Sequence, residues 1–204
     1  ASTQVTIGAA LASARAMAIK EQKYTGIRFQ EDVNGDQYMV YIVKDAVNLN
    51  LPDTGFRAVE GVKPIKLPNN IRAVEYFTDD SAYDDADKMR NRKTFSVIFN
   101  QAGKLVVRYV RVRNRDGEWD SSSNYSLDDI FNKRYDVDNG TGKFYQDDYP
   151  TLGLDEELSQ ARFLIYEVGI FEKINVNGRY SNYLYELEPV YINAYTGKLI
   201  DSEQ

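Results

Sequence analysis

The hydrophobic periodicity of this chain changes from that of a helix to that of a strand close to its start, and that change restricts the folds available to it. Residues 9–19 are dominated by alanine, with leucine, methionine and arginine, all strong helix formers. Four apolar residues recur there at the spacing of one helix face, namely Ile7, Leu11, Ala14 and Ala18. We predict a helix over about residues 2–22. The expected packing face is widened by Val5, Ala12, Ala16 and Ile19.

Residues 24–30 alternate between apolar and polar residues, as half-buried strands do, and residues 38–43 form an apolar run suited to a central strand. Residues 24–30 and 38–43 flank Asn34-Gly35-Asp36 and predict a β-hairpin. Two further hairpins are expected, each around a short turn that contains glycine. They are 95–99 with 105–112, and 190–195 with 198–200. Single strands are expected at 71–77 and 162–168, and a helical stripe at Tyr180, Tyr183, Leu184 and Leu187.

These patterns predict an α+β fold, in which an N-terminal amphipathic helix packs on an antiparallel β-sheet head with a long insertion. We expect a short helix near residues 127–131 and another starting near 155–157, where acidic residues favour a helix N-terminus. The whole chain, 1–204, is expected to form one domain. Its parts are the helix (1–22), the sheet head (23–113), the insertion (114–160) and the C-terminal strands with a helical segment (161–204).

Two residue types are absent from the chain, and their absence excludes whole classes of active site. With no histidine and no cysteine among 204 residues, there can be no Ser-His-Asp triad, no thiol nucleophile, no disulfide and no zinc or iron–sulfur site built on these ligands. A hydrolase that uses a pair of carboxylates stays possible, although nothing in the sequence selects the pair.

Acidic runs offer the only metal ligands, and their hard oxygen atoms would favour calcium. The candidates are Asp79, Asp80, Asp84, Asp85 and Asp87, and a second group of Asp136, Asp138, Asn139, Asp147 and Asp148. Neither group has the spacing of an EF-hand loop, so solvated loops are the preferred interpretation. We therefore expect no cofactor, with calcium as the weaker alternative.

Residues 108–115 form a basic segment in a chain whose net charge is −6. On a strand, alternate residues of this segment would share one face, and such a row of cations could contact a phosphate backbone. The candidates for this contact are Arg108, Arg111, Arg113 and Arg115. The acidic balance of the chain favours a solvated strand instead, and makes a nucleic-acid partner the less favoured hypothesis.

The order of a small-residue helix followed by hairpins resembles bacterial type IV pilin-like proteins, particularly the minor pseudopilins of the GspH/FimT type. Three stretches carry the resemblance. They are the arginine-bearing run 11–20, the strand 24–29 and the strand with its glycine turn, 97–103.

The resemblance implies a structural, non-enzymatic subunit of a pilus or of type II secretion. Such a protein is made as a prepilin, methylated, and anchored in the inner membrane by an N-terminal segment that this sequence does not contain. Its head would be periplasmic or extracellular, and its partners would be other pilin or pseudopilin subunits. Helix packing would use Ile7, Leu11, Ala14 and Ala18. A DNA-binding pilin-like module, and less favourably a carboxylate hydrolase, are the alternatives.

Overall fold

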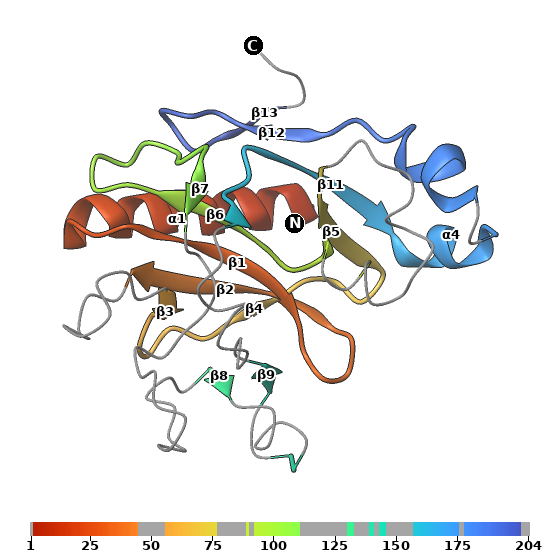
Figure 1. Cartoon of the computed structure of the whole chain (residues 1–204), viewed down its shortest axis with the longest axis horizontal. Coiled ribbons are helices and arrows are strands. Elements are labelled where there is room, and N and C mark those ends of the chain that lie inside the picture. Colours follow the sequence, from red (N-terminus) through yellow and green to blue (C-terminus); the bar gives the residue numbers. More distant parts are fainter. Residues whose placement is uncertain are drawn as a thin grey trace.

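The computed structural model of the chain describes residues 2–44, 56–76, 89, 92–110, 130–132, 139–140, 143–145, 157–175 and 178–200. It is an α+β structure with one long N-terminal helix and antiparallel sheets (Figure 1). The predicted fold class is therefore confirmed at this level.

The N-terminal helix, α1, spans Thr3–Glu21, as the alanine-rich pattern predicts. Ser2 caps it, because the Ser2 hydroxyl accepts a hydrogen bond from the Val5 amide at 3.3 Å. At the other end Gln22 takes the left-handed conformation (φ 53°), and its backbone N–H bonds back to the Ala18 carbonyl. The helix therefore stops just before the first strand begins.

The first sheet, called sheet A here, is built around the predicted hairpin. β1 (Thr25–Glu31) lies between β2 (Gln37–Lys44) and β6 (Phe95–Phe99), and all three are antiparallel. Two short strands that the sequence pattern did not predict, β3 (Phe56–Ala58) and β4 (Ile65–Lys66), pair with β2.

The second sheet, sheet B, has the strand order β13-β12-β11-β5. Its strands are β5 (Ile71–Glu75), β11 (Arg162–Glu167), β12 (Val190–Ile192) and β13 (Leu199–Ile200). The predicted C-terminal hairpin is thus present, but the strands of the head form two sheets instead of one.

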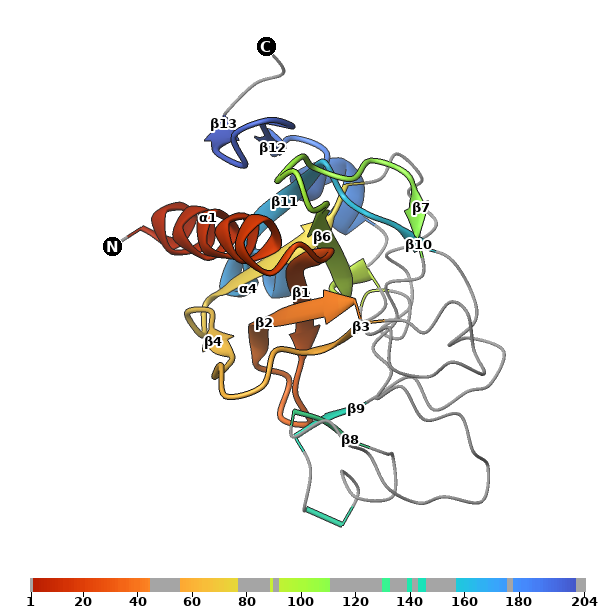
Figure 2. The same ribbon diagram turned by 90° about the vertical axis from the view of Figure 1, so that its left-hand side faces the viewer.

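Helix α1 lies between the two sheets, with β12 and β13 on one side and β1 and β2 on the other (Figures 1 and 2). One hydrophobic core joins all three parts. At its centre are three phenylalanine rings. Phe29 and Phe95 of sheet A stack at 4.5 Å, and Phe163 of sheet B lies 5.7 and 5.8 Å from them.

Both sheets are also covered on the faces that point away from α1. Behind sheet A, Phe131 and Phe144 pack on Tyr38, Val40 and Ile98. These phenylalanines come from β8 (Phe131–Asn132) and β9 (Phe144–Tyr145), a short parallel pair.

Behind sheet B, the third core cluster includes Phe171 of α4 (Val168–Lys173) and Leu184 of the π-helix η4 (Tyr180–Leu184). Burial on two faces explains why β2 and β6 read as nearly continuous apolar runs.

Some local predictions were only partly right. The second hairpin pairs only at its base, where Phe99 bridges Leu105, and β7 (Tyr109–Val110) then pairs with β10 (Glu157–Leu158). The hairpin separates because the edge of β6 is occupied by residues distant in sequence. The Ile98 amide donates to the Ser159 hydroxyl at 3.0 Å, and the Gln160 amide to the Ser96 carbonyl at 2.9 Å.

The two short helices expected in the insertion fall mostly on residues outside the described part of the chain. At their described ends, Phe131 and Glu157 lie in the strands β8 and β10. At these two positions, pairing with a neighbouring strand overrides the weak helix preference. Of the stripe at residues 180–187, the part Tyr180–Leu184 is helical, as a π-helix, and residues 185–187 form a turn.

Candidate functional site

The buried face of α1 consists of the four residues chosen from the periodicity together with Ala10. Ile7, Leu11, Ala14 and Ala18 are each 0% exposed and belong to the core between the sheets. Because two of the four are alanines, the helix axis can approach the strands closely. This face of α1 therefore packs against the two sheets of the same chain.

The expected widening of that face was wrong. Val5 is 61% exposed and Ile19 40% exposed, and Ala12 and Ala16 are also exposed. A helix that fills the angle between two sheets still leaves its outer side to solvent. That outer side is short-chained and carries no charge from residue 3 to residue 14.

Two of the three stretches that carry the pilin-like resemblance meet in space. The Nε of Arg15 in α1 donates a hydrogen bond of 2.9 Å to the carbonyl of Gly103, in the turn after β6. Gly103 has a φ of +70°, and a Cβ at this position would lie 2.6 Å from Cδ1 of Ile19. The arginine and the glycine of the two motifs are thus parts of one contact between the helix and sheet A.

The turn between β12 and β13 approaches the same part of the helix. A Cβ on Gly197 (φ +69°) would lie 3.2 Å from Cδ of Arg15 and 3.2 Å from the ring of Phe99. Arg15 therefore lies between one turn from each sheet. The sequence patterns indicate a helix containing Arg15 and turns containing Gly103 and Gly197. No local pattern indicates that these residues lie together.

Of the four arginines proposed as phosphate contacts, Arg108 is the one that falls within the described residues. Arg108 is exposed, and one of its guanidinium nitrogens lies 3.4 Å from the hydroxyl of Tyr24, to which it donates. The Nζ of Lys44 lies 5.8 Å from the centre of the same ring. Tyr24 therefore has a cation on two sides. Arg111, Arg113 and Arg115 lie outside the described residues.

Nearly all of the candidate calcium ligands lie outside the described residues as well. They are Asp79, Asp80, Asp84, Asp85, Asp87, Asp136, Asp138, Asp147 and Asp148. Asn139 is described and exposed. Within the described part of the chain, no group of three or more acidic residues is arranged to hold a metal ion.

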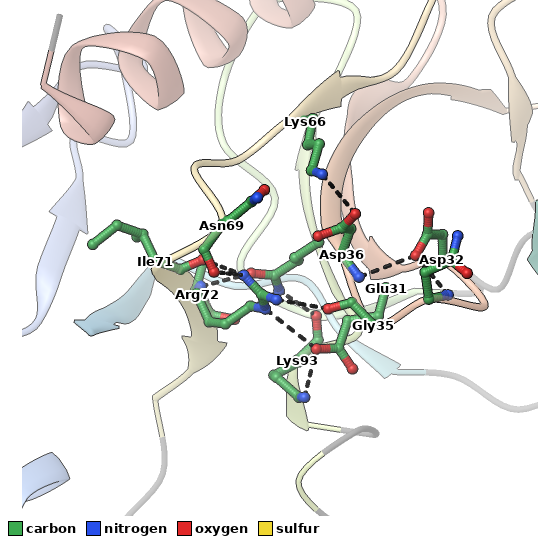
Figure 3. Close-up of polar contacts among 12 residues, drawn as sticks. Glu31, Asp32, Gly35, Asp36, Lys66, Asn69, Ile71, Arg72 and Lys93 are labelled. Carbon is green, nitrogen blue, oxygen red and sulfur yellow. Dashed lines mark hydrogen bonds and ion pairs between the residues drawn. The ribbon is translucent and has the colours of Figure 1, made fainter. Parts of the chain in front are cut away.

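A charged network that the sequence did not reveal lies at the tip of the β1–β2 hairpin (Figure 3). Glu31 accepts a hydrogen bond from Lys93 Nζ at 2.5 Å and lies 3.4 Å from Nε of Arg72. The other Arg72 nitrogens donate to the carbonyls of Gly35, Asn69 and Ile71 at 2.7–3.0 Å. Glu31 belongs to sheet A and Arg72 to sheet B, so this network joins the sheets.

The same hairpin carries a second, more exposed pair. Lys66 Nζ donates to Asp36 Oδ2 at 2.6 Å, and this hydrogen bond lowers the pKa of Asp36 and raises that of Lys66. Asp32 shapes the turn, since its Oδ1 accepts from the amides of Asn34 and Asp36 at 2.9 and 3.0 Å. These contacts stay within sheet A and its hairpin, whereas the contact of Glu31 with Arg72 joins the two sheets.

Burial also affects one titratable group beside this network. Tyr166, on β11, pairs across the sheet with Arg72 and is 4% exposed. Burial raises the pKa of its hydroxyl, and the nearby Glu31 carboxylate raises it further. Tyr166 is therefore neutral over the physiological range and serves packing against Phe171, 4.9 Å away.

No protein-family model, curated protein or solved structure matches this chain. Among the helices in the described part of the chain, none is both long enough and apolar enough to span a membrane.

Proposed function

We propose that this chain is the head of a pilin-like or pseudopilin subunit, a structural protein that acts through contacts with other subunits. In the native protein, an apolar segment preceding α1 would anchor it in the inner membrane, with the head on the periplasmic or extracellular side. The chemistry proposed is assembly, without catalysis and without a cofactor.

The observation that carries this proposal is the contact between Arg15 and Gly103. These residues come from two of the three stretches on which the resemblance rests, 88 positions apart along the chain. In this fold they fasten the helix to sheet A, which gives a physical reason for an arginine in a small-residue helix and for a glycine in the following turn.

The two sides of α1 support the same proposal. The core of the head buries Ile7, Leu11, Ala14 and Ala18, so contacts with other subunits would use the opposite side of the helix. That side contains Val5, Ala9, Ala12 and Ala16, whose short side chains let another helix approach closely. A continuous helix could thus hold its own head with one side and a neighbour with the other.

The first experiment is performed on the native protein. The membrane fraction of the source cells is enriched, and the N-terminal peptides of the protein are identified by mass spectrometry. We expect a processed, N-methylated apolar segment directly ahead of α1. A protein recovered only from soluble fractions, with an ordinary secretory start, would overturn the proposal.

A matched pair of variants tests assembly without disturbing the fold. Ala12→Arg places a long cation on the outer side of α1, whereas Ala102→Arg places it in an exposed turn. We expect Ala12→Arg to abolish recovery of the protein in sheared or cross-linked fibres, and Ala102→Arg to leave it unchanged. Equal recovery of both variants would count against the outer side as a subunit contact.

A second candidate function is recognition of single-stranded nucleic acid, and the cluster of Tyr24, Lys44 and Arg108 favours it. An aromatic ring with flanking cations combines base stacking with phosphate contacts. The test is binding of a labelled oligonucleotide at low and high salt, with the double variant Lys44→Glu and Arg108→Glu. The control variant Lys63→Glu changes a charge elsewhere, at a site between β3 and β4. Binding that is absent at low salt would eliminate this candidate.

A further inference from the structure

The guanidinium of Arg15 in α1 is held by one of its three nitrogens. Its Nε donates to the Gly103 carbonyl at 2.9 Å. Within the described part of the chain, its two terminal nitrogens have no hydrogen-bond or ion-pair partner. The side chain is half-buried, so these nitrogens remain accessible from outside. Arg15 therefore keeps the planar fork of donors that matches the two oxygens of a carboxylate.

Two turns, one from each sheet, hold the stem of this side chain. A Cβ added at Gly103 would lie 3.2 Å from Nε of Arg15, and one added at Gly197 would lie 3.2 Å from its Cδ. The turns are also joined to each other, because the Leu105 amide donates to the Ala194 carbonyl at 2.8 Å. A guanidinium held in this way has already lost much of its rotational freedom, so binding an anion costs little further entropy.

The two turns around Arg15 add positive charge and no negative charge. Residues 100–104 and 193–198 contain no Asp or Glu, and each turn ends in a glycine followed by an exposed lysine. The Nζ of Lys104 lies 4.8 Å from the centre of the Tyr195 ring, so this cation also links the two turns. In a chain with 31 acidic and 25 basic residues, this locally basic surface favours an anionic group from outside.

Arg15 also borders the outer side of α1, to which the proposed function assigns the subunit contacts. Ala12 and Ile19 are its neighbours on the helix surface, at i−3 and i+4, and both are exposed. The helix carries no charge from residue 3 to residue 14, so the short side chains of its outer side would let a neighbouring helix slide along it. An ion pair at Arg15 would fix one position, as a single polar residue fixes the register of a coiled coil.

We propose that Arg15 is a carboxylate-binding site at the subunit contact. Its two terminal nitrogens donate to the oxygens of an Asp or Glu side chain on a neighbouring subunit, whose helix lies along the outer side of α1. The ion pair sets the register between the subunits, and the short apolar side chains supply close packing. This inference rests on the proposed function and deepens it, because it names the polar contact and its chemistry.

The first test compares Arg15→Gln with Arg179→Gln in the full native protein. Arg179 is a matched control, because it also donates from Nε to a backbone carbonyl, that of Ile174 at 3.1 Å, but packs on Phe171 behind sheet B. We expect Arg15→Gln to reduce recovery in sheared fibres by about tenfold or more, since charge-assisted hydrogen bonds are lost. Arg179→Gln should leave recovery unchanged.

Urea denaturation of the purified variants establishes that each is folded. If Arg15→Gln is not folded, Arg15→Lys takes its place, since lysine keeps the charge but lacks the fork.

The second test identifies the partner group. In Arg15→Lys, a carbodiimide can condense the new amine with a carboxylate in contact with it, which forms an amide bond. We expect mass spectrometry of the fibres to find such a bond between position 15 and an Asp or Glu of a neighbouring subunit. Lys173, an exposed native lysine of α4, is the internal control and should form no intersubunit bond above background.

Two results would overturn this inference and leave the proposed function intact. One is recovery of Arg15→Gln in fibres at the level of the unaltered protein. The other is a yield of intersubunit bonds at position 15 of Arg15→Lys that does not exceed the yield at Lys173. Absence of the unaltered protein from the fibres would instead overturn the proposed function, and this inference with it.

Discussion

The side-chain amide of Gln37 forms two hydrogen bonds with the backbone of Ala73, in the manner of a strand residue. Its Nε2 donates to the Ala73 carbonyl at 2.8 Å, and its Oε1 accepts from the Ala73 amide at 2.7 Å. Gln37 belongs to β2 and Ala73 to β5, so one side chain connects the edge of sheet B to sheet A. The same Nε2 also donates to the carbonyl of Lys93 at 2.8 Å.

Replacing Gln37 by leucine should therefore destabilise the protein strongly. Gln37 is 0% exposed, so the Ala73 N–H and C=O groups would stay buried without this partner. We expect a loss of about 3 kcal/mol or more in the free energy of unfolding. The measurement is urea denaturation, with Gln101→Leu as the control at an exposed position. A loss below about 1 kcal/mol would contradict this view of the junction.

Gly26 should tolerate no side chain, because it faces the adjacent strand β6. A Cβ there would lie 2.2 Å from the Val97 carbonyl oxygen and 2.6 Å from Cδ1 of Ile98. Since a backbone atom cannot move aside easily, we expect Gly26→Ala to cost about 3 kcal/mol.

The control for this prediction is Gly169→Ala. Nothing lies within 4 Å of a Cβ at Gly169, which is in helix α4. There the alanine should stabilise by about 0.5–1 kcal/mol. Thermal unfolding of the two variants gives shifts of opposite sign if both environments are as described.

The contact between the helix and the β6 turn can be measured by comparing two glycines of positive φ. Gly103→Ala should be more costly than Gly140→Ala by about 1 kcal/mol, because both alanines are strained at positive φ but only the one at position 103 meets Ile19. Adding Ile19→Ala to Gly103→Ala should remove most of that difference. A double-mutant cycle from denaturation data checks this, and an interaction energy near zero would argue against the contact.

The Lys66–Asp36 pair should contribute to stability within a defined pH range. The pKa of Asp36 is below its ordinary value of 3.8 in the folded state, so its contribution is present above about that pH and is lost as the pH falls through the lowered value. The pKa of Lys66 is above 10.5, so its contribution is complete below that pH and is lost as the pH rises through the raised value.

The variant Lys66→Met removes the pair and gives the test. The difference in stability between it and the unaltered protein should be largest near neutral pH. It should disappear at both acidic and strongly alkaline extremes, and it should shrink in high salt. A difference that is constant across the titration would show that Lys66 acts by packing alone.

Much of the architecture was readable from local patterns. A hydrophobic period of 3.6 residues predicts helix α1. A period of two residues, or a short apolar run beside a turn, predicts the hairpin of β1 and β2, the strands β5, β6 and β11, and the C-terminal hairpin. A single residue can end a helix or form a turn. Ser2 does so by accepting a hydrogen bond from the Val5 amide, and Gly35 and Gly103 do so by adopting a positive φ.

The candidate sites were less accessible to the same reasoning. The buried helix face was identified because four residues repeat on one side of α1. The network around Glu31 was not, because Glu31 and Lys93 are 62 positions apart and neither departs from an ordinary strand or turn pattern. Assembly of this chain as a pilin-like subunit stays a proposal.

Neighbouring residues alone were enough to predict the small-residue helix α1, the hairpin of β1 and β2 and the C-terminal hairpin. How those elements meet depends on the tertiary structure. It divided the strands into two sheets, exposed Val5 and Ala12 while burying Leu11, and paired β7 with β10 instead of β6. The physical reason is that burial and edge pairing depend on which distant surface is available, and that choice leaves no period in the local sequence.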